Sequence, residues 1–302
     1  MKQPDPNTTC ESILLSSRRS SLVRDAMRCF ARNRLAVSGL VILTLIVLCA
    51  VFGPLIARQS PYAVDLKNFR SPPSRQHWLG TDPAARDVFA RVIFGARVSL
   101  TVGLFSVGLY VAIGTFLGLF SGYYGGWIDA LIMRLTDTMM SLPPLLLMMM
   151  LVTLTGPSLF NLILAFGLTR WPSIARLVRG QVLYARETEF IVAAHAIGVP
   201  SMRIVTRHIL PNVLAPVIVA ASFGMASAIL SEASLSFLGL GLRPPTASWG
   251  LMLKEAQSIS ILSGMPWFWI PPGLMIAVCV LSINFVGDGL RDALDPRRQT
   301  SS

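Results

Sequence analysis

Residues 192–212 read VAAHAIGVPSMRIVTRHILPN, and this polar stretch with two arginines stands between long apolar segments. Residues 186–197 have the pattern of a helix, Gly198 is free to leave helical backbone angles, and Pro200 suits the first turn of a second helix. The stretch predicts two short helices that meet at an elbow of small residues. Set among apolar segments, it predicts a knob that projects from a membrane domain.

The side chains of this hairpin suit docking better than catalysis. Ala193 and Ala194 are small enough to let another protein surface approach the helix backbone closely. Arg203 and Arg207 lie one turn apart on the second predicted helix. The alternative is an ordinary basic cytoplasmic loop.

The composition restricts the chain to one class of protein. Of its 302 residues, 53% are hydrophobic and only 14% are charged, and its apolar runs can cross about 30 Å of hydrocarbon. We predict an all-α polytopic membrane protein, which excludes a soluble enzyme. The six expected spans are residues 35–57, 98–120, 131–154, 159–178, 213–235 and 267–285. The fourth is the least apolar, because it carries Arg170 and Pro172 near its end.

The net charge of +11 does not indicate a nucleic-acid partner, because the 26 lysines and arginines sort by side of the membrane. With the N-terminus inside, 17 of them fall inside and nine outside. By the positive-inside rule, this distribution places both termini and the hairpin in the cytoplasm. Residues 58–97 oppose the trend, since they carry seven of the nine outside charges.

The loop after the first span has a pattern of its own, HWLGTDPAARDVFARVIFGARVSL at residues 77–100. Asp82 followed by Pro83 is typical of a helix N-cap and first helical residue. Beyond them, apolar and charged residues interleave with helical spacing, which predicts an amphipathic helix on the membrane surface. Its apolar face would comprise Val88, Phe89, Val92 and Ile93.

The hairpin resembles the cytoplasmic coupling loop of ABC importer permeases. That loop has the pattern EAA, three residues, Gly, nine residues, then an apolar residue, any residue and LP. The matching residues are Ala193, Ala194, Gly198, Leu210 and Pro211. Val192 stands in place of the Glu, and His208 in place of the apolar residue. The resemblance implies that the matching residues, together with Arg203 and Arg207, form the joint to an ATPase subunit.

Three further segments resemble the permeases of dipeptide, oligopeptide and nickel importers. Residues 77–100 match the signature HxLGTDxxGRDVxSRxIxGARxSL, although Ala85 replaces its first glycine after the aspartate. We infer that a glycine-specific backbone conformation is not essential there. Residues 232–253 (EASLSFLGLGLRPPTASWGLML) and 285–297 (FVGDGLRDALDPR) match two other stretches of these permeases. The chain is identified as a C-type permease subunit of this family.

The resemblance implies a type I ABC importer fold with six transmembrane helices, of which five form the permease core. The expected partners are a B-type sister permease, two ABC ATPase subunits and a periplasmic solute-binding protein, in the bacterial inner membrane. No cofactor is expected. The expected parts are a basic cytoplasmic arm (1–34), a peripheral first helix (35–57), a periplasmic loop with the amphipathic helix (58–97), the permease core (98–290) with its coupling loop (186–212), and a cytoplasmic tail (291–302). Residues 240–266 are expected to fold back as a plug over the outer mouth.

Catalytic motifs are absent from the sequence, as expected for a non-catalytic subunit. There is no GxxxxGK[ST] phosphate loop, so the energy for transport must come from a partner. The three histidines lack the spacing of a metal site, and the four cysteines are expected to be unpaired.

Charged residues inside the spans are costly in lipid and must face protein or water. Glu232, deep in the fifth span, has two interpretations: it lines the substrate path and binds a peptide's amino terminus, or it hydrogen-bonds a neighbouring helix. Arg134 and Asp137 lie one turn apart in the third span and are expected to form a structural pair, with a gate as the alternative. The adjacent Pro143 and Pro144 are expected to kink that span.

The predicted function is to form half of the translocation pathway for di- or oligopeptides delivered by the binding protein. Nickel chelates and glutathione stay open as cargo. A secondary transporter is a remote alternative, because the sequence has no internal repeat. A membrane hydrolase would need a nucleophile and a base, and the sequence has no such motif.

Overall fold

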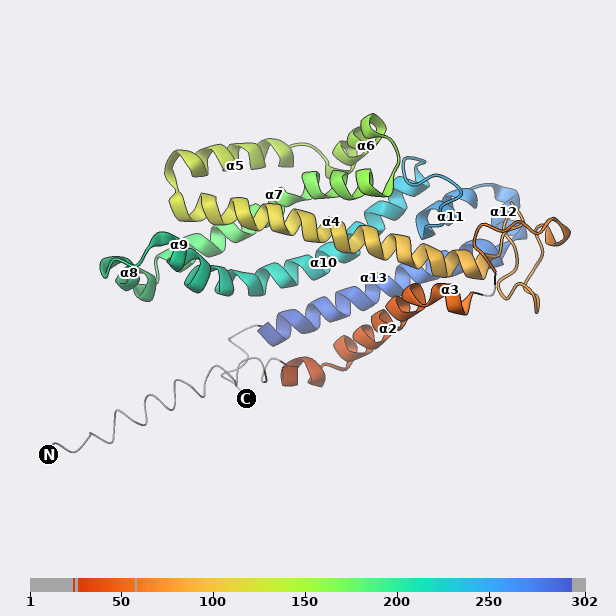
Figure 1. Ribbon diagram of the computed structural model, residues 1–302, viewed down its shortest axis with the longest axis horizontal. Coiled ribbons are helices and arrows are strands. Elements are labelled where there is room, and N and C mark those ends of the chain that lie inside the picture. The colour runs from red at the N-terminus through yellow and green to blue at the C-terminus, as the bar shows by residue number, and fades with distance from the viewer. Residues whose placement is uncertain (1–23, 25–26, 58, 295–302) are drawn as a thin grey trace.

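The computed structural model describes residues 24, 27–57 and 59–294, and over this part the chain is an elongated bundle of helices without a β-strand (Figure 1). The predicted all-α fold is confirmed. The basic arm expected at 1–34 and the tail expected at 291–302 lie largely outside the described residues.

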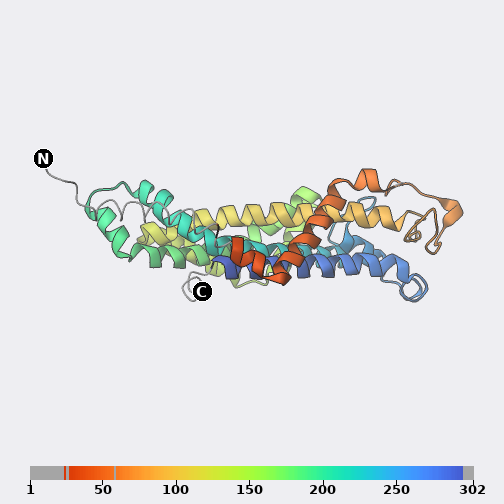
Figure 2. The same cartoon turned by 90° about the horizontal axis from the view of Figure 1, so that it is seen from below.

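The bundle has two distinct ends, which we call the hairpin end and the loop end (Figures 1 and 2). The hairpin end holds α8 (Glu189–Ala196) and α9 (Ser201–Ile204), and the loop end holds residues 59–87, including η1 (Leu66–Asn68), with α11 (Trp249–Glu255) and α12 (Ile259–Gly264). Between them lie α2 (Arg34–Val51), α3 (Gly53–Ile56), α4 (Val88–Tyr124), α5 (Gly126–Met140), α6 (Pro144–Thr155), α7 (Leu159–Arg186), the π-helical turn η2 (Val205–Ile209), α10 (Leu210–Phe237) and α13 (Pro266–Leu294).

Four helical segments among the described residues are long and apolar enough to cross a membrane. They are α2, α4, the continuous segment Ser201–Phe237 and α13. Helices α5 and α6 qualify only as a pair, and they are bent by 87° where they meet. Helix α7, with 28 residues, is long enough but less apolar, because it carries four arginines. The six expected spans correspond to these four segments, the bent pair and α7.

The bend between α5 and α6 confirms the kink expected from the two adjacent prolines. Pro143 has extended backbone angles (φ −58°, ψ 125°), as a residue that precedes another proline tends to have. Pro144 then occupies the first turn of α6, where its missing N–H leaves no hydrogen bond unmade. The third span is therefore two helices at nearly a right angle and not one straight rod.

Helices α4 and α7 pack with their backbones close together, and glycines make this possible. Gly114, Gly118 and Gly122 follow one another at every fourth residue on one face of α4. A Cβ on Gly118 would lie 2.6 Å from the carbonyl oxygen of Ala175 and 2.7 Å from Cβ of Val178, both on α7. This is the small-residue packing of membrane helices, and the GxxxGxxxG spacing is the sequence signal that predicts it.

The first turns of α4 differ from the expected surface helix. No helix begins at Asp82; α4 starts at Val88 after the N-cap Asp87, whose carboxylate accepts from the backbone N–H of Ala90 at 2.7 Å, and then continues without interruption to Tyr124. Of the charged residues expected on an exposed face, Arg91 is fully buried. The interleaved pattern therefore marks a helix buried on both faces, with charges that pair inside the protein.

The turn before α4 also corrects the inference made for Ala85. This residue is 1% exposed and has a φ of +58°, in the left-handed region that glycine favours. Its N–H donates to the carbonyl oxygen of Asp82 at 3.0 Å, which closes the turn. The glycine-like conformation is thus retained even though the residue has a Cβ.

The segment 240–266 folds back onto the bundle, and its role as a plug over the outer mouth stays a prediction. Trp249 of α11 is fully buried, and its indole Nε1–H donates to the carbonyl oxygen of Val92 at 2.9 Å. A Cβ on Gly250 would lie 2.6 Å from Cα of Ala233, so α11 also approaches α10 closely. The segment is fixed against both α4 and α10.

Helix α2 lies at the edge of the bundle and crosses its long axis obliquely (Figure 2). It contacts α13 closely at Gly39, where a Cβ would lie 2.7 Å from the carbonyl oxygen of Ser282. Its other faces expose large apolar side chains, among them Leu40, Leu45 and Leu48. This arrangement suits the peripheral helix expected at 35–57.

Candidate coupling hairpin and adjoining groove

The helix–elbow–helix arrangement predicted for residues 192–212 is present. Helix α8 ends at Ala196, and Gly198 has a φ of +77°. The N–H of Val199 donates to the carbonyl oxygen of Ala194 at 3.1 Å, which fastens the elbow to α8. The positive φ explains the glycine, because L-residues with a side chain rarely adopt it.

The second helix of the hairpin is continuous with a spanning helix. Helix α9 passes through the π-helical turn η2 directly into α10. Pro211 explains the turn, because it has no N–H for the carbonyl oxygen of Arg207 and its ring would crowd that oxygen. In the same turn, the Asn212 side chain donates to the carbonyl oxygen of His208 at 2.9 Å.

The predicted docking residues lie on two sides of the hairpin. Ala194 is buried and packs in a hydrophobic cluster with Ile191, Ile204 and Ile209, which holds the two helices together. The exposed residues are Ala193, Gly198, Arg203, Arg207 and Pro211, and Leu210 is half-buried. No atom lies within 4 Å of a Cβ built on Gly198, so the elbow is open to a partner.

Polar contacts fix the hairpin to the end of α4. The hydroxyl of Tyr123 and Nε2 of His195 are 3.0 Å apart. Arg186 Nη1 donates to the carbonyl oxygens of Gly122 and Tyr123, at 3.0 and 2.9 Å. The hairpin is therefore a supported projection. Among the described residues no cluster of His, Cys, Asp or Glu could hold a metal ion.

A groove adjoins the hairpin between α7 and α10. It consists of two adjoining pockets of about 580 and 570 Å³ that share Gln181 and Asn212. The first lies beside the hairpin, against Phe190 and Arg207. The second continues along the two helices to Leu177 on α7 and to Pro216 and Val219 on α10, and Arg291 and Leu294 of α13 complete its wall. Two side-chain amides at its centre give the groove hydrogen-bond donors and acceptors.

Arg170 bridges α7 and α10 further along the same pair of helices. Its Nη1 donates to the hydroxyl of Ser227 at 2.8 Å, and its Nη2 donates to the hydroxyl of Ser231 at 3.0 Å. Its Nε is buried and has no hydrogen-bond partner among the described residues. The sequence marks this arginine only as a polar residue near the end of the fourth span.

Glu232 lies one residue beyond this bridge but faces a different part of the bundle. It is fully buried, and its carboxylate accepts from the hydroxyls of Ser99 on α4, at 3.1 Å, and Ser236, at 2.8 Å. The geometry favours the interpretation in which Glu232 hydrogen-bonds a neighbouring helix over the one in which it lines the substrate path.

At the loop end, four charged residues join the turn before α4 to α11. Arg86 Nε donates to Asp82 Oδ2 at 2.7 Å, and its Nη2 donates to Glu255 at 3.1 Å. Arg91 Nη1 donates to Asp82 and, at 2.6 Å, to Glu255. Burial acts against the charge of Arg86, but Asp82 and Glu255 outweigh it and raise the pKa of the guanidinium above its ordinary value. We call these four residues the outer clamp.

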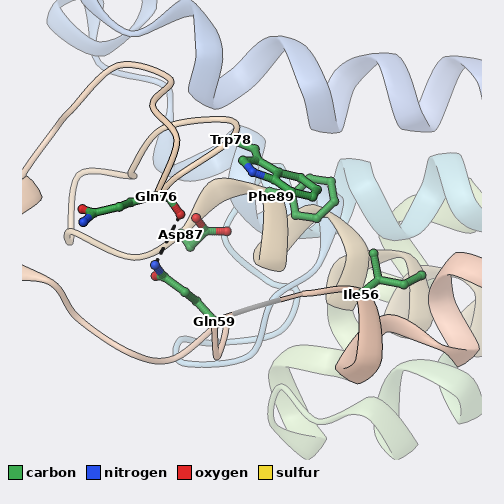
Figure 3. Close-up of a pocket in the computed structure, with 6 residues that line it drawn as sticks. All are labelled: Ile56, Gln59, Gln76, Trp78, Asp87 and Phe89. Atoms are coloured by element: carbon green, nitrogen blue, oxygen red, sulfur yellow. Dashed lines mark hydrogen bonds between the residues drawn. The ribbon is translucent and has the colours of Figure 1, made fainter.

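A small pocket at the loop end is lined by six residues, which are Ile56, Gln59, Gln76, Trp78, Asp87 and Phe89 (Figure 3). Its volume is about 10 Å³, and Gln59 Nε2 donates across it to the carbonyl oxygen of Gln76 at 3.4 Å. The rings of Trp78 and Phe89 are 5.0 Å apart between centroids on its wall. A space of this size holds about one water molecule and no cargo.

The ion pairs of the third span differ from the expected one. Asp137 pairs with Arg176 on α7 at 2.6 Å and not with Arg134. Asp129 likewise receives two hydrogen bonds from Arg179, at 2.5 and 2.6 Å. Both aspartates pair with arginines of α7 because α5 lies along that helix. The spacing of residues within the third span does not reveal this arrangement.

Comparison with known proteins identifies the family. Residues 114–300 match the family model of the binding-protein-dependent transport system inner membrane component, and residues 21–73 match the N-terminal TM domain of oligopeptide transport permease C. The chain is 45% identical over 277 residues to the dipeptide transport system permease protein DppC of Alkalihalophilus pseudofirmus, covering 92% of this chain and 90% of that one. It is 42% identical over 274 residues to the glutathione transport system permease protein GsiD of Escherichia coli, covering 89% of each.

A solved structure shares the fold. The inward-facing MetNI methionine ABC transporter contains a chain that superposes with a TM-score of 0.56 at 20% identity, over 68% of this chain and 96% of that chain. Such a likeness supports the type I importer fold alone. The family model over residues 114–300 and the relatives above 40% identity show that the chain belongs to the family of inner membrane components of binding-protein-dependent transport systems.

Proposed function

We propose that this chain forms half of the translocation pathway of an ATP-driven importer of di- or oligopeptides, which a solute-binding protein delivers. The chain itself is a non-catalytic membrane subunit of the ABC transporter class. The name of its 45% identical relative supports dipeptide cargo. The proposed partners are a B-type sister permease, two ABC ATPase subunits and the binding protein, with both termini and the hairpin in the cytoplasm.

The observation that carries this proposal is the shape of the hairpin. A contact that transmits force needs a supported projection with a slim tip. The buried Ala194 and the hydrogen bonds of Arg186 and His195 provide the support, while Ala193 and the open elbow at Gly198 provide the tip. The exposed Arg203 and Arg207 offer charge-assisted contacts to an acidic partner surface. Leu210 and Pro211 connect this joint to the spanning helix.

The test is a bulky residue at the elbow. Gly198→Trp should abolish the stimulation of ATP hydrolysis by cargo-loaded binding protein, because the side chain would block docking and the positive φ adds strain. Overpacking costs about 1–3 kcal/mol, and the middle of that range weakens docking about thirtyfold. The complex should still contain all of its subunits.

Gly156→Trp is the matched control for this test. Gly156 also has a positive φ, +86°, and open space around its Cβ position, but it lies at the other end of α7. It should retain coupled ATPase activity. Wild-type coupling in purified Gly198→Trp complexes would show that the hairpin is not the joint.

Glutathione is a second candidate cargo, favoured by the relative named as a glutathione permease. Uptake by the reconstituted importer with its own binding protein separates the two. Uptake of labelled dipeptide but not of labelled glutathione supports the first proposal, and uptake of labelled glutathione but not of labelled dipeptide supports the second.

A further inference from the structure

Arg170 is a cation inside a spanning bundle whose hydrogen-bond partners are neutral. Its two terminal nitrogens donate hydrogen bonds to the hydroxyls of Ser227 and Ser231. Among the residues that the structure describes, no Asp or Glu forms an ion pair with it. The buried Nε has no partner in this part of the chain. By contrast, Arg176 and Arg179 on the same helix each pair with an aspartate. Arg170 alone among these three keeps its charge available.

A cation at such a position is costly, and two hydroxyls compensate it only in part. Charged residues within membrane spans are rare and commonly mark the paths of substrates or ions. A purely structural bridge between α7 and α10 would need no charge, because a neutral amide could donate to the same two serines. The guanidinium therefore requires a further explanation.

The groove between α7 and α10 leads toward Arg170. On α7, Leu177 and Gln181 line the groove, and they lie seven and eleven residues after Arg170, on the same helix face. On α10, Ser227 lies eleven residues after Pro216 of the groove, which is also about three turns and the same face. The bridge thus lies on the helix faces that line the groove, about 10 Å of helix beyond Leu177, and we call this place the head of the groove.

We propose that Arg170 binds a carboxylate of the peptide cargo at the head of this groove, a site that rests on and deepens the proposed importer function. A planar guanidinium matches a carboxylate with two parallel hydrogen bonds. The hydroxyls of Ser227 and Ser231 accept hydrogen bonds from the guanidinium when no cargo is present. The amides of Gln181 and Asn212 then face the peptide backbone, whose donors and acceptors they can pair.

Cysteine protection measures this binding directly. In a cysteine-free background, Val219→Cys places a reporter on the groove wall, eight residues or about 12 Å of helix from Ser227. Extended tetraalanine reaches about 14 Å, so a molecule anchored at Arg170 covers the reporter. The complete permease–ATPase complex in nanodiscs is treated with N-ethylmaleimide, with tetraalanine or tetraalanine amide added at millimolar concentration and without binding protein. Both faces of a nanodisc are accessible, so membrane orientation does not affect the result.

Tetraalanine should slow alkylation, and its amide should need about tenfold more peptide for equal protection, since it lacks the charged partner. Arg170→Gln should remove this difference between the two peptides. Arg170→Lys keeps the positive charge and should keep a weaker preference for the free carboxylate. If the glutamine variant does not assemble, loss of part of the preference in the lysine variant is the result that supports the site. The matched controls Arg176→Gln and Glu232→Gln should leave the preference unchanged, because those residues pair away from the groove.

Equal protection by the two peptides, or protection by neither, overturns the proposal. So does a preference that survives in Arg170→Gln. These outcomes are separate from the proposed function, which is tested by ATP-driven peptide uptake through the same complex. Peptide uptake without the carboxylate preference would contradict the Arg170 site alone. Absence of peptide uptake would contradict the proposed peptide cargo.

Discussion

Ala85 holds a buried turn in a left-handed conformation that disfavours a side chain. Such angles cost an L-residue about 1–2 kcal/mol, and β-branched residues are true outliers there. We expect Ala85→Val to lower the thermal unfolding midpoint of the purified permease, because it adds both strain and bulk. Ala84→Val is the control, since Ala84 is exposed and has no positive φ. Equal loss in the two variants would show that the conformation at residue 85 is unimportant.

Among single residues, the sequence predicts those whose role is local. Gly198 can be recognised because an elbow with positive φ favours glycine, and its φ is +77°. Arg91 cannot be recognised as a buried residue, because one of its two partners, Glu255, is 164 residues away in the chain. Helical spacing alone assigns Arg91 to an exposed face. The same limit hides the two serines that Arg170 contacts on α10.

At the scale of elements, the packing of α4 on α7 depends on glycines with no room for a methyl group. Gly118→Ala should destabilise the purified permease by about 1–3 kcal/mol, because its Cβ would lie 2.6 Å from a backbone oxygen. Gly108→Ala, on the same helix with nothing within 4 Å, should be neutral or stabilising by up to about 1 kcal/mol. Thermal unfolding in detergent measures both. Similar midpoints would show that α7 shifts to accept the methyl group.

Helix boundaries follow from the sequence only where the signals are unambiguous. Both Asp82 and Asp87 can cap a helix. The helix begins after Asp87 because residues 82–86 form a turn in which Ala85 has a left-handed conformation. Apolar runs predict the spans, and the adjacent prolines Pro143 and Pro144 predict a bend. The sequence does not predict the angle of that bend. The direction of α6 is set by its packing in a cluster that includes α7 and, from distant parts of the sequence, Val102 of α4 and Leu235 of α10.

At the scale of the whole molecule, the two ends of the bundle should face opposite sides of the membrane. In a cysteine-free background, Ser74→Cys at the loop end should react with an impermeant thiol reagent in intact cells, because residue 74 is exposed there. Met202→Cys at the hairpin end is 62% exposed and should react only after permeabilisation. The inverse labelling pattern would reverse the proposed orientation, in which the hairpin is cytoplasmic.

The continuity of the hairpin with α10 has a mechanical consequence. Residues Ser201–Phe237 form one continuous helical segment of 37 residues, about 55 Å long, which under the proposed function would act as a lever with one arm at the hairpin. A tilt of about 5° would move its far tip by about 5 Å. The π-helical turn and Pro216 are the points where its ladder of backbone hydrogen bonds is altered, so flexure during a transport cycle concentrates there. Beyond Pro216 the helix is stiff, so motion that passes these two flexible points would reach the depth of Arg170.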